Sequence, residues 1–189
     1  MLCWNGKVYY QGRKINKNGG LIGFNKDNAL VLTKDSAKKA IANGMDRAVE
    51  FGPFLVVNGV PTTFKGNGGW GIANRAAIGQ RQDGIVIFIV IDGRTSKSVG
   101  ISMTDLADLF IKYKCYNAAN LDGGGSSVLY VKKKLTDSKG TVVNTPKGYG
   151  YEGERYMPNA WMILPSAIEK HKQEAEPKTD ETKTTEEVK

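Results

Sequence analysis

The chain has 189 residues, of which 40% are hydrophobic, and it carries a formal net charge of +8. This length and apolar content describe a globular protein with a hydrophobic core, and they exclude a disordered or collagen-like chain. No apolar run reaches the length of a bilayer span and no apolar signal segment follows Met1, so stable membrane insertion and a secretory leader are not expected.

The charge is distributed unevenly along the chain. Residues 166–189 hold five Lys and seven Asp or Glu, which leaves 22 basic and 12 acidic residues, a net of +10, in residues 1–165. We therefore predict one domain over residues 1–165 and a charged flexible tail or linker over 166–189. A basic domain favours anionic partners, such as phosphate-bearing glycans, nucleic acid or an anionic cell surface.

Short strands and turns dominate the first quarter of the chain. Strands are predicted at residues 7–10, 21–24 and 29–32, with a polar turn at 16–20 and a run of basic and small residues after 33. Asp35 or Ser36 can cap a short helix with Ala37, Ala40 and Ile41 on its apolar side, closed by Gly44. Cys3 forms no metal or redox motif with Cys115, which we predict to be a buried free thiol.

The next segment is strand-like from Ala48 to Val57 and is broken by Gly52-Pro53. Asn58-Gly59 is a strong hairpin signal that joins this segment to Val60–Phe64. A glycine-rich loop follows, and it contains Trp70. The indole either stacks on a ligand or covers the loop.

A continuous β-branched run from Ile85 to Ile91 has the pattern of a strand buried on both faces. We predict that it is the centre of the sheet, reached through a hairpin at residues 82–84. The fold class that follows is α+β: a mixed, strand-rich sheet with a buried central strand and a few packed helices.

A helix is predicted after Ser102-x-x-Asp105, which resembles a capping box. Its apolar side comprises Met103, Leu106, Leu109, Phe110 and Tyr113. It leads into a strand over residues 115–121, and further strands are predicted at 128–131, 141–143 and 160–164. Lys132-Lys133-Lys134 is expected on a solvated strand edge. The only histidine, His171, lies in the tail, so histidine is not expected in catalysis.

The residues Asn120-Leu121-Asp122-Gly123-Gly124-Gly125-Ser126-Ser127 form the most informative stretch of the chain. Three glycines allow close approach of the backbone to a ligand, and successive amides in such a turn can bind an anion. A carboxylate precedes them and two hydroxyls follow. The alternative is an ordinary flexible hairpin loop. The turn is not a Walker loop, because no Lys-Ser or Lys-Thr follows the glycines.

Polar clusters end or begin three apolar strands: Arg75, then Asp92 with Arg94, then Asp122–Ser127. Charged groups beside buried strands are costly unless they are paired or used. Each cluster taken singly could be a structural ion pair. Together with an amide-lined turn in a basic domain, they indicate an anion site.

These motifs carry a resemblance to a known family. Gly52-Pro53, Asn58-Gly59, Arg75-x-Ala77-Ile78-Gly79, Asp83-Gly84, Asp92-Gly93-Arg94 and the glycine octet are similar to the phosphodiester glycosidases over residues 48–164. That family includes the enzyme that uncovers mannose 6-phosphate by removing N-acetylglucosamine from a phosphodiester, and exopolysaccharide-related bacterial proteins. Asn74-Arg75-Ala76 stands where the family usually has Pro-Arg-Thr. We find no counterpart of the family's Asn-Gly-Gly-x-Phe-like segment upstream of Gly52, and expect the domain to lack it.

The resemblance implies a mixed α/β domain with a pocket for a sugar-1-phosphodiester, in an extracellular or cell-surface setting. The implied activity is hydrolysis of a C1–O–phosphate linkage in a surface or secreted polysaccharide; the alternative is a catalytically inactive glycan-binding module. No cofactor is implied, and Asp92 and Asp122 are too few ligands to argue for a metal. Nucleic acid is not the expected partner, because the aromatic residues are not interleaved with Lys and Arg along a strand.

The chemistry of this reaction suggests a role for each type of candidate residue. Breaking the anomeric C–O bond releases a phosphate monoester with a second pKa of about 6, so no strong general acid is needed. Arg75 and Arg94 can bind phosphate bidentately, and the amides of Gly123, Gly124 and Gly125 with the hydroxyls of Ser126 and Ser127 can complete the site. Asp122 and Asp92 are candidates for the nucleophile, the base for water or the group that orients an arginine. Asn120, Asn159 and Trp70 are candidate sugar contacts, although Asn159 could simply set the turn after Pro158.

Overall fold

The computed structural model describes residues 2–10, 19–132, 138–146 and 155–163. Several predictions fall outside these described residues. They concern residues 16–18 of the polar turn, Lys133 and Lys134, Leu164, and the tail with His171.

The N-terminal part of the chain forms a five-stranded sheet, sheet A, in which every pairing is antiparallel. Its strands lie in the order β2-β1-β5-β3-β4 and comprise β1 (Leu2–Trp4), β2 (Lys7–Tyr10), β3 (Gly20–Asn25), β4 (Leu30–Thr33) and β5 (Met45–Phe51). The predicted helix is α1 (Ala37–Ala42), between β4 and β5. Ser36 caps it, because its Oγ accepts a hydrogen bond from the N–H of Lys39 at 3.3 Å.

The second five-stranded sheet, sheet B, carries the strands around the glycine turn. It is also antiparallel, with the order β7-β6-β10-β8-β9. Its strands are β6 (Phe54–Val57), β7 (Val60–Pro61), β8 (Arg75–Arg81), β9 (Val86–Ile91) and β10 (Cys115–Asn120). The Asn58-Gly59 hairpin is confirmed between β6 and β7, and the short 3-10 helix η1 (Lys65–Gly69) follows β7.

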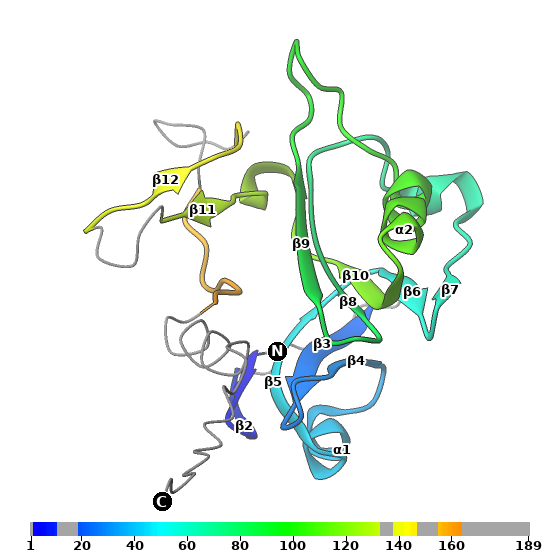
Figure 1. The fold of residues 1–189 in the computed structure, drawn as a ribbon, viewed down its shortest axis with the longest axis vertical. Coiled ribbons are helices and arrows are strands. Elements are labelled where there is room, and N and C mark those ends of the chain that lie inside the picture. Colours follow the sequence, from blue (N-terminus) through cyan, green and yellow to red (C-terminus); the bar gives the residue numbers. More distant parts are fainter. Residues whose placement is uncertain (1, 11–18, 133–137, 147–154, 164–189) are drawn as a thin grey trace, which may run out of the picture.

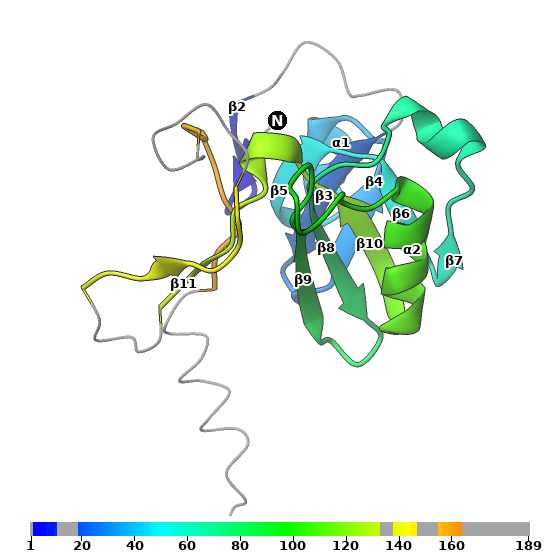
Figure 2. The same ribbon diagram turned by 90° about the horizontal axis from the view of Figure 1, so that it is seen from above.

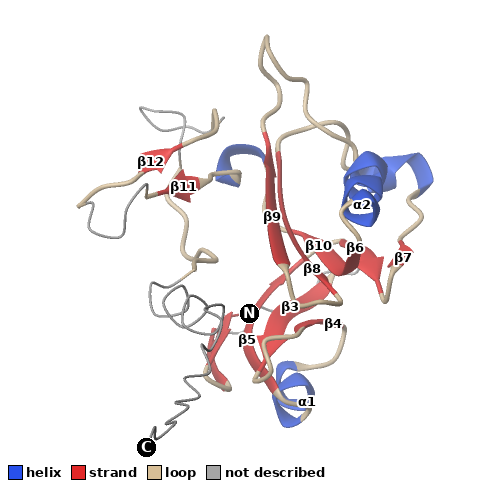
Figure 3. Ribbon diagram, in the orientation of Figure 1, coloured by secondary structure: helices blue, strands red, loops and turns tan. Residues whose placement is uncertain are grey.

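The two sheets pack on each other, and helix α2 (Met103–Lys112) covers the other face of sheet B (Figures 1 and 2). Between the sheets, Ile22 and Phe24 of sheet A contact Ile78 and Ala119 of sheet B. Under α2, a second apolar cluster joins the helix to the same sheet through Met103, Leu106, Phe110, Leu55 and Ala77. The predicted α+β class is thus confirmed, with strands and helices distributed as in Figure 3.

The prediction of the central strand is wrong. β9, which contains most of the run Ile85–Ile91, is the edge strand of sheet B, and β10 lies at its centre between β6 and β8. The apolar run is explained by packing on both faces: Phe88 contacts the cluster between the sheets, whereas Ile87 and Ile89 contact the cluster under α2. Side-chain periodicity reports what covers the faces of a strand, not how many strands flank it.

The structure confirms the predicted start of α2 but differs in one residue of its buried side. The Ser102 cap of α2 is confirmed: its Oγ accepts from the N–H of Asp105 at 3.0 Å and donates to that carboxylate at 2.6 Å. Tyr113, however, is half exposed at the end of the helix, and Ala107 takes its place on the buried side. None of the helices in the described part of the chain is long and apolar enough to cross a membrane.

The C-terminal part forms less regular structure than predicted. A two-stranded sheet of β11 (Tyr130–Val131) and β12 (Thr141–Val142) stands beside the main body (Figure 1). Residues 160–163 do not form the expected strand. Met162 and Ile163 are 74% and 65% exposed, and only Trp161 packs on the core, edge-on to Phe24 at 5.5 Å between ring centroids.

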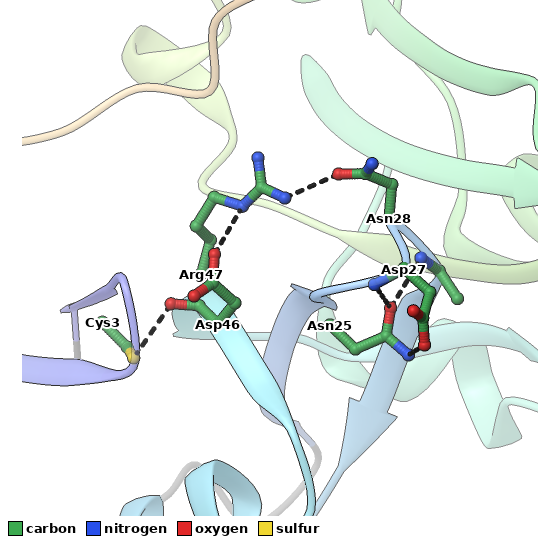
Figure 4. Close-up of polar contacts among 7 residues, drawn as sticks. Cys3, Asn25, Asp27, Asn28, Asp46 and Arg47 are labelled. Carbon is green, nitrogen blue, oxygen red and sulfur yellow. Dashed lines mark hydrogen bonds and ion pairs between the residues drawn. The ribbon is translucent and has the colours of Figure 1, made fainter.

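Polar contacts fix the turn between β3 and β4 of sheet A (Figure 4). Arg47 donates from Nη2 to Oδ1 of Asn28 at 2.6 Å, and its Nε lies 3.2 Å from Oδ2 of Asp46. The Asn25 side chain accepts from the N–H groups of Asp27 and Ala29 at 3.0 and 2.9 Å. These bonds hold the β3–β4 turn against β5 and give it a structural role.

Candidate functional site

The predicted site residues lie at one end of the strands of sheet B. β8 begins where its antiparallel neighbours β9 and β10 end, so Arg75 pairs with Ile91, and the N–H of Gly124 donates to the carbonyl of Asn74 at 3.1 Å. The short helix η2 (Gly124–Ser126) accordingly lies beside the end of β9 in both views (Figures 1 and 2). Arg75, Asp92 and Asp122 are therefore brought to the same end of the sheet, where β8 begins and β9 and β10 end.

Close packing of backbones at this end of the sheet depends on two glycines. A Cβ on Gly123 would lie 2.9 Å from the carbonyl oxygen of Asn74, and a Cβ on Gly93 would lie 2.7 Å from the Asn74 N–H nitrogen. Both distances are too short for a real side chain. The loops after β9 and β10 thus meet the start of β8 without intervening side chains, which explains glycine in the Asp-Gly-Arg and Asp-Gly-Gly-Gly motifs.

Arg75 is a buried cation whose hydrogen-bond acceptors are neutral. Its side chain is 4% exposed, and Nη2 donates to the carbonyls of Trp70 and Gly71 at 3.0 and 2.6 Å. No carboxylate among the described residues pairs with it, and its buried Nε has no partner there. Burial, and secondarily the charge of Arg94, lower the pKa of the Arg75 guanidinium. An anion at this point would offset both costs.

The glycine turn offers fewer free groups than its sequence suggests. The N–H of Gly124 is bound to Asn74, and those of Ser126 and Ser127 are bound to carbonyls of the turn itself at 3.0 and 3.1 Å. The amides of Gly123 and Gly125 make no such bond within the described part of the chain. Ser127 is fully buried, and the Ser126 hydroxyl donates to Asp122, so the turn can bind an anion mainly through two amides.

Asp122 combines exposure with fixed orientation. The Ser126 hydroxyl and the Arg155 guanidinium both donate to its Oδ2, at 2.6 and 2.9 Å. The other carboxylate oxygen, Oδ1, has no hydrogen bond from any described residue, and about half of the side chain is exposed. Asp122 is therefore an oriented carboxylate with one oxygen available to a ligand. Sequence reasoning missed Arg155, because it lies in an irregular segment without a motif.

Asp92 is bound on both oxygens. The N–H of Thr145 donates to Oδ1 and to Oδ2, each at 2.9 Å, and Asn144 donates to Oδ1 at 3.0 Å. The Asn144 side chain also donates to the Ser127 carbonyl at 2.7 Å and accepts from Leu129 N–H at 2.8 Å. None of these bonds is to an arginine, so Asp92 does not orient an arginine among the described residues; it braces residues 144 and 145 instead, and its role in the chemistry stays a prediction. Asn144 and Thr145 were not foreseen.

The remaining candidates occupy different surroundings. Asn120 is 2% exposed and donates through Nδ2 to the carbonyl of Gly52 at 3.0 Å, so it anchors the strand end rather than facing solvent. Arg94 is exposed, lies close enough to Arg75 to lower its pKa, and adopts a positive φ of 55°. Asn159 is exposed and makes no hydrogen bond with the described residues.

A hollow of about 680 Å³ adjoins the site on the side of Trp70. Phe54, Phe64 and Trp70 contribute aromatic rings to it, and Lys34 and Lys65 contribute charge. Trp70 is half-buried, lines this hollow and packs on the cluster under α2, and its stacking on a ligand stays a prediction. Within the described part of the chain, no group of three His, Cys, Asp or Glu is arranged to hold a metal ion.

Comparison with curated proteins finds partial relatives. The chain is 41% identical over 102 residues to the SPbeta prophage-derived uncharacterized protein YomE of Bacillus subtilis (strain 168), which covers 52% of this chain and 16% of that protein. Over 64 residues it is 34% and 36% identical to N-acetylglucosamine-1-phosphodiester alpha-N-acetylglucosaminidase of Bos taurus and Homo sapiens. That match covers 34% of this chain and 12% of each enzyme, so the chain spans a small part of these relatives.

Among solved structures, the catalytic domain of the zebrafish N-acetylglucosamine-1-phosphodiester alpha-N-acetylglucosaminidase, auto-inhibited by its pro-peptide, superposes with a TM-score of 0.54. The match covers 68% of this chain and 45% of that chain at 22% identity, and supports the fold. The profile of the phosphodiester glycosidase family matches residues 1–164, so it takes in sheet A as well as the segment from residue 48 that carries the motifs. The chain belongs to the phosphodiester glycosidase family.

Proposed function

We propose that this chain is a hydrolase that cleaves the C1–O–phosphate bond of a sugar-1-phosphodiester in a surface or secreted polysaccharide. The observation that carries the proposal is Arg75, a buried guanidinium with only carbonyl partners among the described residues, at the same end of sheet B as the Asp122 carboxylate. A buried charge of this kind favours an anionic ligand over solvent. Family membership supports the same reaction class.

We place the phosphate beside Arg75 and the glycine turn. A side-chain atom at Gly123 would be 3.7 Å from Nη1 of Arg75, so the guanidinium lies directly beside the bare Gly123 backbone, and an anion near one can reach the other. Arg94 adds a second cation close enough to act on Arg75, and the amides of Gly123 and Gly125 add neutral donors. Cations and preorganised amides at this position stabilise the negative charge that develops on the departing phosphate.

Asp122 would act on the sugar carbon. Ser126 and Arg155 both bind Oδ2, which leaves Oδ1 to face the anomeric centre. As the C1–O bond breaks, electrons pass to the phosphate oxygen, and Oδ1 either attacks the carbon or removes a proton from the attacking water. Phosphate monoester leaves without a strong acid, which agrees with a site built from arginines, amides and a carboxylate.

A chromogenic sugar-1-phosphodiester tests the proposal. We expect the protein to release the phosphate ester, and Asp122→Asn to lower kcat/KM by at least about 100-fold. Asp83→Asn is the matched control: Asp83 also pairs with an arginine, but at the opposite end of β8, and its change should leave kcat/KM within about twofold. Equal rates for the two variants would contradict the role of Asp122.

A binding module without activity is the competing assignment from another functional class. It would bind the diester at Arg75 with no turnover in any buffer. In that case Arg75→Gln would abolish binding, whereas Asp122→Asn would leave both binding and the absence of turnover unchanged.

A further inference from the structure

The hollow beside Trp70 has a composition that apolar packing does not explain. Phe54, Phe64 and Trp70 form its aromatic part, and three threonines, Thr33, Thr62 and Thr63, add hydroxyls. Aromatic faces with nearby hydroxyls suit sugar rings, because a ring presents apolar C–H groups on its faces and hydroxyls on its rim. The volume of about 680 Å³ exceeds what a single phosphate needs.

The charge of the hollow has one sign. Lys34 and Lys65 both line it, and no acidic residue is among the described residues around it. Neither lysine forms an ion pair with a described carboxylate. A basic hollow with unpaired ammonium groups favours an occupant that carries negative charge, and lysine binds phosphate as a point charge.

The position of the hollow indicates which of the two groups esterified to the phosphate would bind in it. Arg75 lies between the two parts of the site: Nη2 donates to the Trp70 carbonyl on one side, and Nη1 lies toward Gly123 on the other. Asp122, on the Gly123 side, would face the anomeric carbon. The hollow, on the Trp70 side, would therefore receive the group attached through the other ester oxygen of the phosphate.

We propose that the hollow lined by Lys34, Lys65 and Trp70 binds the alcohol-side sugar of the diester, and that this sugar carries a second phosphate. This inference rests on the function proposed above for Arg75 and Asp122. The substrate class is accordingly a phosphorylated glycan, in which the sugar left on the phosphate is itself anionic. The hollow then sets specificity for the part of the substrate that does not undergo the reaction.

Two diesters with the same scissile sugar-1-phosphate separate this inference from a general electrostatic effect. In one the phosphate is esterified to a neutral hexose, and in the other to the same hexose bearing a phosphate. We expect Lys34→Gln with Lys65→Gln to lower kcat/KM for the phosphorylated diester by about tenfold and to leave the neutral one within about twofold. Lys26→Gln with Lys112→Gln, which removes two exposed lysines elsewhere, should change neither.

A third diester, to a hexuronic acid, distinguishes a phosphate from a carboxylate as the recognised anion. Selectivity of the lysine variant for the phosphorylated diester supports the proposal as stated. Equal losses on all three diesters, no loss on any, or a loss confined to the hexuronic acid would overturn it.

Equilibrium binding tests the hollow without turnover, so a failure of the proposed hydrolysis is recognisable separately. The probe is a hexose bisphosphate, titrated calorimetrically into the full chain and into the two double variants. Binding that weakens about tenfold in the Lys34 and Lys65 variant alone supports the proposal even when no diester is cleaved. No binding, or equal binding by all three proteins, overturns it.

Discussion

Strand β8 begins and ends with an arginine, and the two arginines have opposite surroundings. Arg81, at the hairpin end, forms an exposed ion pair with Asp83, its side chain being 34% exposed. Arg75, at the other end, is 4% exposed and bonds only to carbonyls among the described residues. The same side chain on the same strand is thus paired with a carboxylate at one end and buried without a described counter-charge at the other.

The difference arises from what surrounds each end rather than from the strand. At the hairpin end a short turn brings Asp83 back toward Arg81 over two residues. At the site end three separate loops converge, and their glycines let backbones approach where side chains would otherwise supply counter-charges. A charged side chain pairs most easily with an opposite charge across a short turn. A buried charge without such a partner is found here where loops from distant parts of the chain meet.

The largest expected effect comes from removing the buried cation. Arg75→Gln should lower kcat/KM on a sugar-1-phosphodiester by about 10²–10³, the usual cost of losing a preorganised donor to a developing negative charge. The free energy of unfolding should not fall, because glutamine relieves the cost of burying the charge and can still donate to the Trp70 carbonyl.

Arg81→Gln is the matched control, and it should leave kcat/KM within about twofold. If Arg75→Gln instead lowered the unfolding free energy by several kcal/mol and reduced activity only in proportion to the folded fraction, Arg75 would be a structural residue and the contrast between the two ends would fail.

Cys115, which pairs with Arg81 at the hairpin end, should make stability depend on pH. Burial raises the pKa of its thiol from 9.0 to about 11, although the charge of Arg81 acts in the opposite direction. Between these values the folded protein retains the proton and the unfolded chain loses it, so stability falls as pH rises through this range. The contribution amounts to about 3 kcal/mol at most.

Denaturant unfolding at about pH 8 and about pH 10.5 measures this dependence. Cys115→Ala should lower stability at the lower pH through lost packing, but its stability should decline less between the two pH values. Parallel declines in both proteins would show that the thiol does not titrate as its burial requires.

Asn144 connects Asp92 to the Ser127 carbonyl after the glycine turn, and we expect Asp92 and Asn144 to act as one hydrogen-bond network. Asp92→Asn and Asn144→Ala should each lower kcat/KM by about tenfold, because each weakens the hydrogen bonds that hold residues 144 and 145 at the end of β9. The double variant should be no worse than the poorer single variant, since residues in one network are not additive. Additive losses would indicate that Asp92 takes part in the chemistry directly.

The smallest effects concern the two exposed ion pairs, Arg81–Asp83 and Arg155–Asp122. Double-mutant cycles on unfolding should give coupling energies below about 1 kcal/mol for both pairs. The same cycles on kcat/KM should show coupling only for Arg155 with Asp122, because that arginine orients the carboxylate through Oδ2. Coupling of equal size in both pairs would remove the functional distinction.

Much of this fold could be predicted from local pattern. The Ser102 cap of α2 and the Asn58-Gly59 hairpin are confirmed because their chemistry is contained within a few residues. The edge position of β9 could not be predicted, since an apolar run covered on both faces looks the same at the edge or the centre of a sheet. Residues 160–163 were predicted from hydrophobicity as a strand, yet no neighbouring strand pairs with them among the described residues.

The candidate site divides in the same way. Convergence of Arg75, Asp92 and Asp122 was predictable, because their segments adjoin strands that pair with one another. The hydrogen bonds of the Ser126 hydroxyl and the Gly124 amide, and the burial of Ser127, were not predictable, since they depend on contacts within the folded turn. Arg155 and Asn144 lie far along the chain in irregular segments, and no periodicity or motif marks them.

The connection between the two sheets couples remote parts of the molecule. The chain crosses from β5 to β6 through Gly52 and Pro53, and Asn120 binds the carbonyls of both, through Nδ2 and its own N–H, each at 3.0 Å. Asn120 stands two positions before Asp122. Any sliding of sheet A over sheet B would therefore displace the Asp122 carboxylate, so substitutions in the first fifty residues have a mechanical route to the candidate site.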